Sequence, residues 1–233
     1  MKKKTKLIVL EGCDASGKST QIKLILNFLK ENNIKHDFIH FPAYGNNEAS
    51  KIIELYLRGE FGNINEVNPI FIASIYALDR YLYLPIIRKK LFENDVIILD
   101  RYVFSNMAYQ GAKYENETQS ELIKKWIYNL EFKFLELPYP DLNIFFDVPI
   151  DFIKEKLIIN KREGEDRHYL NGKNDIHEMD IKFQERVRNN YLTLKKYKNF
   201  KIINCSYEDN NQYKIYSPEE IFNKYINYIK KII

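Results

Sequence analysis

Hydrophobic residues along the chain follow two alternating patterns: short continuous runs, and longer segments with helical spacing. The first run covers residues 5–11, and the apolar residues after it recur at intervals of three and four. Runs of about four to eight residues are typical of buried strands, and the longer spacing is typical of amphipathic helices. Strands that alternate with helices predict a parallel sheet covered by helices on both faces. Further strand-length runs are residues 36–41, 96–99, 142–146 and 200–203.

The segments between and after these runs have helical periodicity. The final helix has a clear start signal, because Ser217 is an N-cap residue, Pro218 follows in the first turn and Glu220 comes three residues after the cap. Together with the strands, the helices predict a three-layer α/β fold around a parallel sheet of about five strands. The other predicted helices cover residues 48–58, 69–93, 117–136 and a stripe through Phe183, Val187, Tyr191 and Leu194.

Residues 160–175 interrupt this order, because they are rich in charge and glycine and have no apolar periodicity. We expect this segment to be a mobile lid between two helices. A chain of 233 residues is long enough to bury one sizeable core. We therefore expect residues 1–233 to form a single domain that carries the lid.

Composition excludes several classes of protein. Hydrophobic residues make up 45% and charged residues 29%, which disfavours disordered and fibrous chains. The net charge of +4 is small and its basic residues are interspersed with acidic ones, so nucleic-acid binding is not favoured. The chain has only two cysteines, and it shows no signal peptide and no apolar stretch of roughly 18 residues. We expect a cytoplasmic protein without a membrane partner.

A phosphate-binding motif lies between the first strand and the first helix. Residues 12–19 satisfy the pattern G-x-x-x-x-G-K-[ST], in which glycines let backbone N–H groups point at phosphate oxygens. Lys18 can contact the β- and γ-phosphates, and the Ser19 hydroxyl can ligate Mg²⁺. A chance glycine turn is the alternative, but the flanking strand and helix disfavour it. The residues expected to hold the nucleotide are Gly12, Cys13, Asp14, Ala15, Ser16, Gly17, Lys18, Ser19 and Thr20.

A second polar cluster stands at the end of the third strand. Asp100 and Arg101 directly follow the run at residues 96–99. Because the carboxyl ends of parallel strands face the ligand crevice, both side chains should face the same site as Lys18. A carboxylate suits a water-mediated Mg²⁺ contact, and a guanidinium suits a phosphate. The alternative is a salt bridge at the end of a strand.

The run DRYVFSNMAYQG at residues 100–111 resembles the D-R-[YH]-x-x-S-x-x-A-[YF] motif of the thymidylate kinase family. The resemblance implies a homodimeric enzyme that uses ATP and Mg²⁺ to phosphorylate thymidine 5′-monophosphate (dTMP). The likeness continues in the family's order at Phe41-Pro42, Tyr76 to Arg80, residues 140–149 and residues 177–191.

The resemblance also implies roles for single residues. Arg101 would bind the acceptor phosphate, and Asp100 would support Mg²⁺ together with Ser19. At the base, Tyr76 would stack on thymine, a contact worth about 1–3 kcal/mol by analogy with stacking in single strands. Arg80 would bond the thymine O4, and Asn106 would read N3. Further acceptor contacts would come from Phe41, Ser105, Tyr109 and Gln110.

Two departures from the family pattern change the expected charges. An arginine that is common shortly after Phe-Pro is replaced by Ala43 and Tyr44, and a catalytic arginine that some members carry in the phosphate loop is replaced by Ala15. Because phosphoryl transfer needs cationic stabilisation, the resemblance implies that the lid arginines Arg162 and Arg167 supply it, with Arg162 at the transition state. The alternative is an exposed charge run. The expected catalytic set is Lys18, Arg101, Arg162 and Asp14.

Three further residues carry weaker expectations. The resemblance places Asp14 near the sugar 3′-hydroxyl, although a generic loop carboxylate is the alternative. Cys13 lies at a helix N-terminus beside Lys18, a setting that can lower a thiol pKa. We regard this thiol as incidental to the chemistry, although its alkylation should block ATP. His177 opens the helix after the lid, either to contact the acceptor or to lie at the surface.

Three functions stay open at this point. The first is dTMP phosphorylation, and the second is phosphorylation of another nucleotide or of a deoxynucleoside. Arg101 separates these two, because a nucleoside has no phosphate to occupy it. The third is a regulatory ATPase without kinase activity. A GTPase would show a guanine-reading N-K-x-D pattern, which the sequence lacks.

Overall fold

The computed structural model describes residues 4–163, 170–173, 175–210 and 212–233. At its centre is a five-stranded sheet in the order β2-β3-β1-β4-β5, with every neighbouring pair parallel. All five predicted strands are present. Their bounds are β1 (Lys6–Glu11), β2 (His36–His40), β3 (Val96–Asp100), β4 (Leu142–Asp147) and β5 (Phe200–Asn204).

Helices cover both faces of this sheet, as the alternating pattern predicts. The α-helices are α1 (Lys18–Glu31), α2 (Glu48–Leu57), α3 (Pro69–Leu82), α4 (Leu84–Glu93), α5 (Val103–Gly111), α6 (Glu117–Tyr128), α7 (Ile150–Glu163), α8 (Ile176–Met179), α9 (Ile181–Thr193) and α10 (Pro218–Lys230). A π-helix, η1 (Asn129–Phe134), extends α6, and a 3₁₀ turn, η3 (Leu194–Lys196), extends α9.

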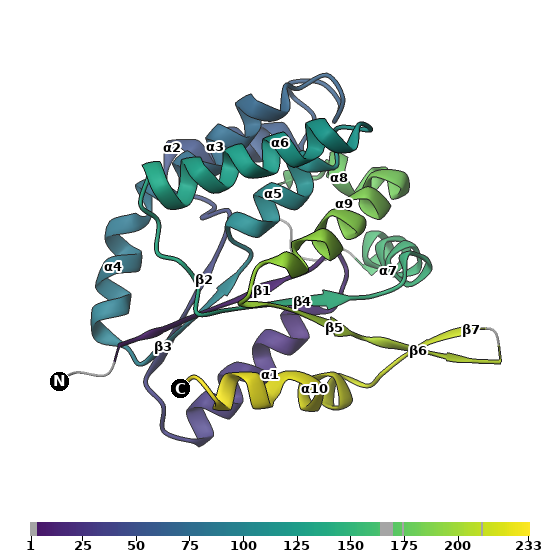
Figure 1. Cartoon of the computed structure of the whole chain (residues 1–233). Coiled ribbons are helices and arrows are strands. Elements are labelled where there is room, and N and C mark those ends of the chain that lie inside the picture. Colours follow the sequence, from purple (N-terminus) through teal and green to yellow (C-terminus); the bar gives the residue numbers. More distant parts are fainter. Residues whose placement is uncertain (1–3, 164–169, 174, 211) are drawn as a thin grey trace.

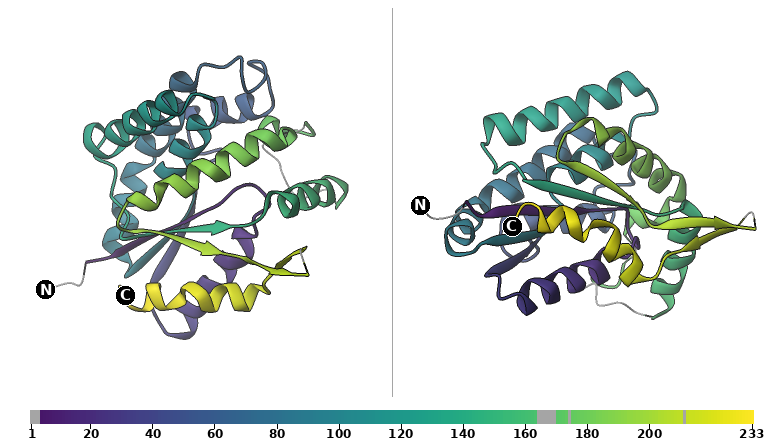
Figure 2. Two further views of the ribbon diagram at one scale, coloured as in Figure 1. Left: turned by 45° about the vertical axis from the view of Figure 1, so that its right-hand side comes forward. Right: turned by 60° about the horizontal axis from the view of Figure 1, so that its bottom comes forward.

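The layers are clear in Figure 1, where α1 and α10 lie below the sheet and α5 and α9 lie above it, with α2, α3 and α6 farther out. Figure 2 shows the same two layers from other sides. The core forms between them because the central strands are apolar on both faces, as expected of a parallel sheet with helices on each side. Every residue of β3 is buried.

Several element boundaries differ from the predicted ones. Residues 69–93 form two helices that meet at an angle of 44°, because Pro85 lacks an N–H and cannot continue α3. The helix predicted over residues 117–136 changes to a π-helix at Asn129. Residues 160–163 belong to α7, so the lid predicted from residue 160 starts inside a helix.

One element was not predicted at all. The strands β6 (Ser206–Asp209) and β7 (Gln212–Ile215) pair antiparallel and project beyond β5 in Figure 1. Their side chains are mostly polar and exposed, so they lack the apolar alternation by which strands are identified in a sequence.

The predicted start of the last helix is confirmed. The Glu220 N–H donates to Ser217 Oγ at 3.3 Å, and the Ser217 N–H donates to Glu220 Oε2 at 2.7 Å, which completes a capping box. Within the described residues, no single helix is long and apolar enough to cross a membrane, and only the bent pair α3 and α4 passes by length and composition.

Candidate active site

A cleft of about 650 Å³ opens at the carboxyl ends of β1, β2 and β3. This volume is within the range of small-molecule sites, and the position is where open α/β sheets bind ligands. The cleft brings together most of the residues that the sequence singled out. They are Asp14, Ala15, Ser16, Gly17, Lys18, Ser19, Thr20, Phe41, Tyr76, Arg80, Asp100, Arg101, Ser105, Asn106, Tyr109 and Gln110.

The phosphate loop has the close backbone packing that its glycines permit. A Cβ atom on Gly12 would lie 2.4 Å from Ser16 Oγ, and Gly17 has a φ of 83°, a conformation that favours glycine. The Lys18 ammonium folds back along the loop and donates to Cys13 O at 3.2 Å. Burial lowers the pKa of Lys18. The loop therefore presents a cation that a phosphate can engage.

Asp14 lies at the centre of a hydrogen-bond network. Its carboxylate accepts from Arg101 Nη2 at 2.5 Å, from the Tyr109 hydroxyl at 2.9 Å and from Gln184 Nε2 at 2.9 Å. Burial alone would raise the pKa of Asp14, but the Arg101 and Lys18 charges outweigh it and lower this pKa to about 2. Asp14 is therefore ionised at neutral pH and holds Arg101 in place.

Arg101 joins the phosphate loop to α5. Its backbone has a φ of 62°, which turns the chain sharply after β3, and its Nη1 donates to Gly12 O at 2.9 Å and to Ser105 Oγ at 3.1 Å. The guanidinium carbon lies 5.0 Å from the centre of the Tyr109 ring. The cation thus stands between the loop and the part of the cleft formed by α3 and α5.

Asp100 offers an oxygen for a magnesium ion. Its Oδ2 accepts from His40 Nδ1 at 3.1 Å, whereas its buried Oδ1 has no hydrogen-bond partner among the described residues. Burial would raise the pKa of Asp100, but the His40 hydrogen bond and Lys18 lower it. The described residues contain no group of three or more His, Cys, Asp or Glu side chains that could hold a metal. Asp100 and Ser19 nevertheless fit Mg²⁺, which takes most ligands from water and phosphate oxygens.

The other end of the cleft presents planar polar groups. Arg80 is buried and donates from Nε and Nη2 to Glu131 at 2.6 and 2.7 Å, and Asn106 Nδ2 donates to the same carboxylate at 2.8 Å. Both amide atoms of Gln110 are buried without a partner among the described residues. Buried polar groups normally have hydrogen-bond partners, so the Gln110 amide favours a planar polar ligand at this end of the cleft.

The loop after β2 carries Ala43 and Tyr44 at the position where the family often has an arginine. The Ala43 N–H donates to Asp79 Oδ2 at 3.0 Å, and Asn47 Nδ2 donates to Asp79 Oδ1 at 2.7 Å. Asp79 is buried beside Arg80 on α3, so it fixes this loop against the helix. The aromatic ring of Tyr44 lines the cleft here.

Three site residues were missed by the sequence reasoning: Glu11, Glu131 and Gln184. Glu131 and Gln184 continue the spacing of buried apolar residues on their helices, as Glu131 follows Ile127 by four and Gln184 precedes Val187 by three. A polar residue on a buried stripe is the signal that could have revealed them. Glu11 carries a similar signal, because it ends an apolar strand directly before the loop.

The expectation of a lowered Cys13 pKa was wrong, and for His177 the structure excludes only the surface alternative. Cys13 is buried and does not line the cleft, and burial raises the pKa of its thiol to about 12 rather than lowering it. His177 is not at the surface but buried in the cleft, where its Nε2 lies 2.9 Å from the Tyr56 hydroxyl. Burial lowers the pKa of His177 to about 3, so the ring is neutral.

The lid arginines lie outside this description. The backbone of Arg162 belongs to α7, but its side chain is outside the described residues, and Arg167 is outside them entirely. Their expected catalytic role therefore remains a prediction.

Comparisons with known proteins agree with this geometry. The thymidylate kinase family model matches residues 10–214. The chain is 31% identical to a probable thymidylate kinase 1 from Saccharolobus solfataricus, over 88% of this chain and 91% of the relative. It is 30% identical to a thymidylate kinase from Mycobacterium tuberculosis, over 81% of this chain and 85% of the relative.

The fold also has a close structural counterpart. A thymidylate kinase from Candida albicans has a TM-score of 0.69 with this chain at 22% identity, covering 98% of this chain and 92% of its own. That likeness shows a common fold, and the family model covers most of the chain. The phosphate loop, the cleft and the matches together identify the chain as a member of the thymidylate kinase family.

Proposed function

We propose that this protein transfers the γ-phosphoryl group of ATP to the phosphate of dTMP. An oxygen of the acceptor phosphate forms a bond to the γ-phosphorus while the bond to the β–γ bridging oxygen breaks, so the products are dTDP and ADP. One observation carries the proposal. Lys18 of the phosphate loop, Arg101 and the amide-rich pocket around Asn106 line a single cleft.

The phosphate loop is proposed to bind ATP. Its backbone N–H groups and Lys18 surround the phosphates, and the N-terminus of α1 adds partial positive charge. Ser19 and Asp100 would hold Mg²⁺, which when bound neutralises charge on the phosphoryl oxygens. The buried and otherwise unpartnered Asp100 Oδ1 supports this assignment.

Arg101 is proposed to bind the acceptor phosphate. It is held by Asp14 and Ser105 beside Lys18, and a guanidinium pairs well with phosphate oxygens. A site of this kind favours a nucleotide over a nucleoside acceptor. The Tyr109 ring packs under the guanidinium, and we propose that it also lies against the deoxyribose.

The charge that the phosphate loop lacks at Ala15 is proposed to come from Arg162. Arginines that stabilise the transferring phosphoryl group contribute about 10³-fold or more to turnover. The variant Arg162→Ala should therefore lose turnover by about that factor. Turnover close to that of the wild type would remove Arg162 from the mechanism and leave Arg167 to be tested in the same way.

The activity is tested by measuring ADP release with Mg-ATP and a panel of acceptors. The panel holds dTMP, dUMP, dCMP, dGMP and thymidine, and kcat/KM is determined for each. We expect dTMP to give the highest value and thymidine to give almost none, because a nucleoside leaves Arg101 without its phosphate. A preference for thymidine would favour a deoxynucleoside kinase, and ATP hydrolysis without any acceptor preference would favour a regulatory ATPase.

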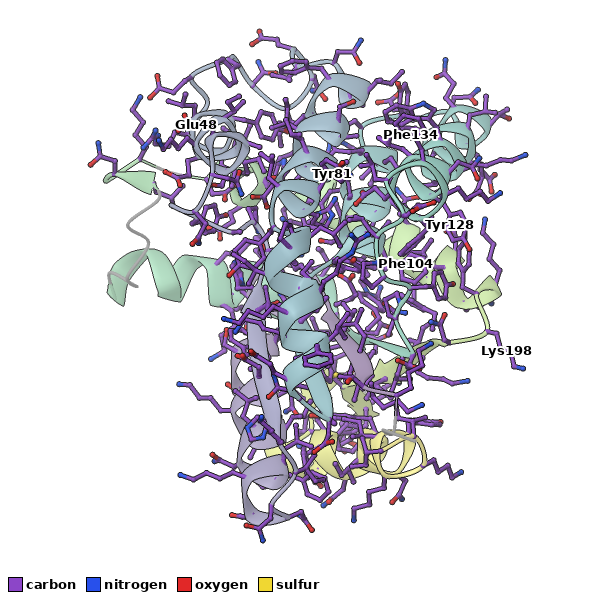
Figure 3. All side chains as sticks on the ribbon, turned by 90° about the vertical axis from the view of Figure 1, so that its left-hand side faces the viewer. Glu48, Tyr81, Phe104, Tyr128, Phe134 and Lys198 are labelled. Carbon is purple, nitrogen blue, oxygen red and sulfur yellow. The ribbon has the colours of Figure 1, made fainter. Side chains whose placement is uncertain are left out.

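A homodimer is also proposed. Large apolar side chains are exposed on α3 and along α6 and η1, and Figure 3 labels two of them, Tyr81 and Phe134. Phe134 is 78% exposed and Leu122 is 62% exposed. Exposed apolar side chains in this number suit contact with a second copy of the chain. Sedimentation should give a dimer for the wild type and a monomer for Leu122→Glu, and a monomeric wild type would refute the proposal.

A further inference from the structure

We propose that Glu131 is a positioning residue that sets the hydrogen-bond polarity of the base site. By fixing Asn106 and Arg80, it makes the site accept a pyrimidine with an N–H at position 3 and a keto oxygen at position 4. The inference rests on the proposed function, because it deepens how the dTMP site reads its base.

The π-helix places Glu131 inside the protein. Ile123 and Ile127 form the buried stripe of α6, and Glu131 continues this stripe into η1. Its side chain is 0% exposed, whereas the nearby Lys133 and Phe134 are exposed. A carboxylate placed so deeply requires partners, and the donors that meet it come from α3 and α5. Short π-helical segments of this kind occur frequently at functional sites.

Glu131 determines which way the Asn106 amide points. Asn106 Nδ2 donates to Glu131 Oε1 at 2.8 Å and to Ala73 O at 3.0 Å. Both partners can only accept, so the amide nitrogen must face them and the oxygen must point elsewhere. Asn106 lines the cleft, and its Oδ1 is buried without a partner among the described residues. The atom left for a ligand is therefore a hydrogen-bond acceptor.

Glu131 fixes the Arg80 guanidinium in the same manner. Its two oxygens accept from Arg80 Nε and Nη2, which locks the plane of the guanidinium. Burial alone would lower the pKa of Arg80, but Glu131 outweighs it and the pKa is raised. Arg80 also lines the cleft, and the bonds to Glu131 use its Nε and Nη2 but not its Nη1. The atom left for a ligand here is a donor.

An acceptor beside a donor is complementary to one edge of thymine and uracil. Their N3–H donates to the Asn106 oxygen, and their O4 accepts from Arg80. Cytosine has the opposite pattern, since its N3 accepts and its 4-amino group donates, so acceptor would face acceptor and donor would face donor. Sites built to hydrogen-bond a polar group reject analogues lacking it by about 10⁴–10⁵-fold.

Glutamine at position 131 cannot reproduce this arrangement. Three donor groups converge on the Glu131 carboxylate, which are Arg80 Nε, Arg80 Nη2 and Asn106 Nδ2. A glutamine amide has one oxygen and one NH₂ group, so at least one of the three donors meets another donor in either orientation. The variant should loosen the polarity of the site while keeping its volume.

The experiment compares dTMP with 5-methyl-dCMP, which has the same methyl group and sugar but the opposite edge polarity. We expect the wild type to favour dTMP in kcat/KM by about 10³-fold or more. Glu131→Gln should reduce this ratio at least about tenfold. The KM for ATP should change less than about twofold. A general loss of structure would instead change ATP binding as well. Glu121→Gln removes the charge of a partly exposed carboxylate that pairs with Lys124 and Lys196 outside the cleft, so it is the matched control and should keep the ratio.

A second variant guards against misfolding. Glu131→Asp keeps the buried charge opposite Arg80 but is one methylene shorter, so its carboxylate cannot reach both Arg80 and Asn106. We expect it to fold, as judged by thermal unfolding, and also to reduce the ratio. A wild-type ratio in a folded Glu131→Gln or Glu131→Asp variant would overturn the inference. A wild type that fails to phosphorylate dTMP would instead refute the proposed function.

Discussion

Glu11 is a buried carboxylate that connects the phosphate loop to the helix carrying the acceptor residues. Its Oε1 accepts from the Tyr102 and Ser105 N–H groups, both at 3.2 Å, and its Oε2 accepts from the Tyr191 hydroxyl at 3.0 Å. Glutamine has nearly the same shape and can satisfy all three groups, because its oxygen accepts both N–H groups and its NH₂ donates to the hydroxyl. The variant Glu11→Gln therefore removes the charge and keeps the contacts.

The magnitude follows from the pKa of this carboxyl. Burial raises the pKa of Glu11 from its ordinary value of 4.5 to about 7, against the opposing charges of Arg101 and Lys18. Between these two values the folded state binds more protons than the unfolded state, so the free energy of unfolding falls as the pH rises. Across the whole window the loss is about 3 kcal/mol. It should be absent in Glu11→Gln.

Urea unfolding of both proteins at several pH values measures this effect. Between pH 4.5 and pH 8, we expect the wild type to lose about 3 kcal/mol of unfolding free energy relative to Glu11→Gln. Other titrating groups cancel in the difference between the two proteins. The variant Glu185→Gln, at an exposed carboxyl on α9, is the control for replacing a glutamate by glutamine outside the core. A difference for Glu11→Gln that does not change with pH would refute the reasoning.

Three further outcomes are expected. Iodoacetamide at pH 8 should leave Cys13 unmodified in the folded protein and modify it in urea. The reason is that the thiol is buried and burial raises its pKa to about 12. Labelling of Cys13 in the folded protein, detected by mass spectrometry, would contradict this. Asp100→Asn should raise the Mg²⁺ concentration for half-maximal velocity about tenfold, and an unchanged requirement would exclude Asp100 from metal support. Tyr109→Phe removes a donor to the Asp14 carboxylate and should lower the free energy of unfolding by about 2 kcal/mol in urea, whereas a loss under about 0.5 kcal/mol would show that this hydrogen bond contributes little.

The sheet could be predicted from the sequence because its strands are short apolar runs next to strong turn signals. The strand and the loop at residues 5–19 are the clearest case, since only a strand, a glycine turn and a helix fit that pattern. The hairpin at residues 206–215 could not be found in this way, because its exposed strands bury little apolar surface. The change to a π-helix at Asn129 is similarly hidden, because residues 129–134 continue the helical periodicity of α6 and contain no glycine or proline.

The site residues that belong to a local sequence motif could be predicted. Lys18, Asp100, Arg101 and Asn106 lie in two local motifs, and the fold brings both to one cleft. The partners that orient these residues come from distant segments and follow no local pattern. Gln184 reaches Asp14 across 170 positions of sequence, and such pairs depend on the packing of α9 against α5. The sequence therefore predicted the side chains that line the cleft better than the side chains that orient them through hydrogen bonds.

The central claim is that the cleft phosphorylates dTMP in preference to other acceptors. It is tested most directly by a competition experiment with limiting Mg-ATP and equal concentrations of dTMP, dUMP, dCMP, dGMP and thymidine, with all products separated and identified by mass spectrometry. We predict that dTDP is the dominant product. A product mixture spread evenly over the nucleotides, or one dominated by phosphorylated thymidine, would contradict the account.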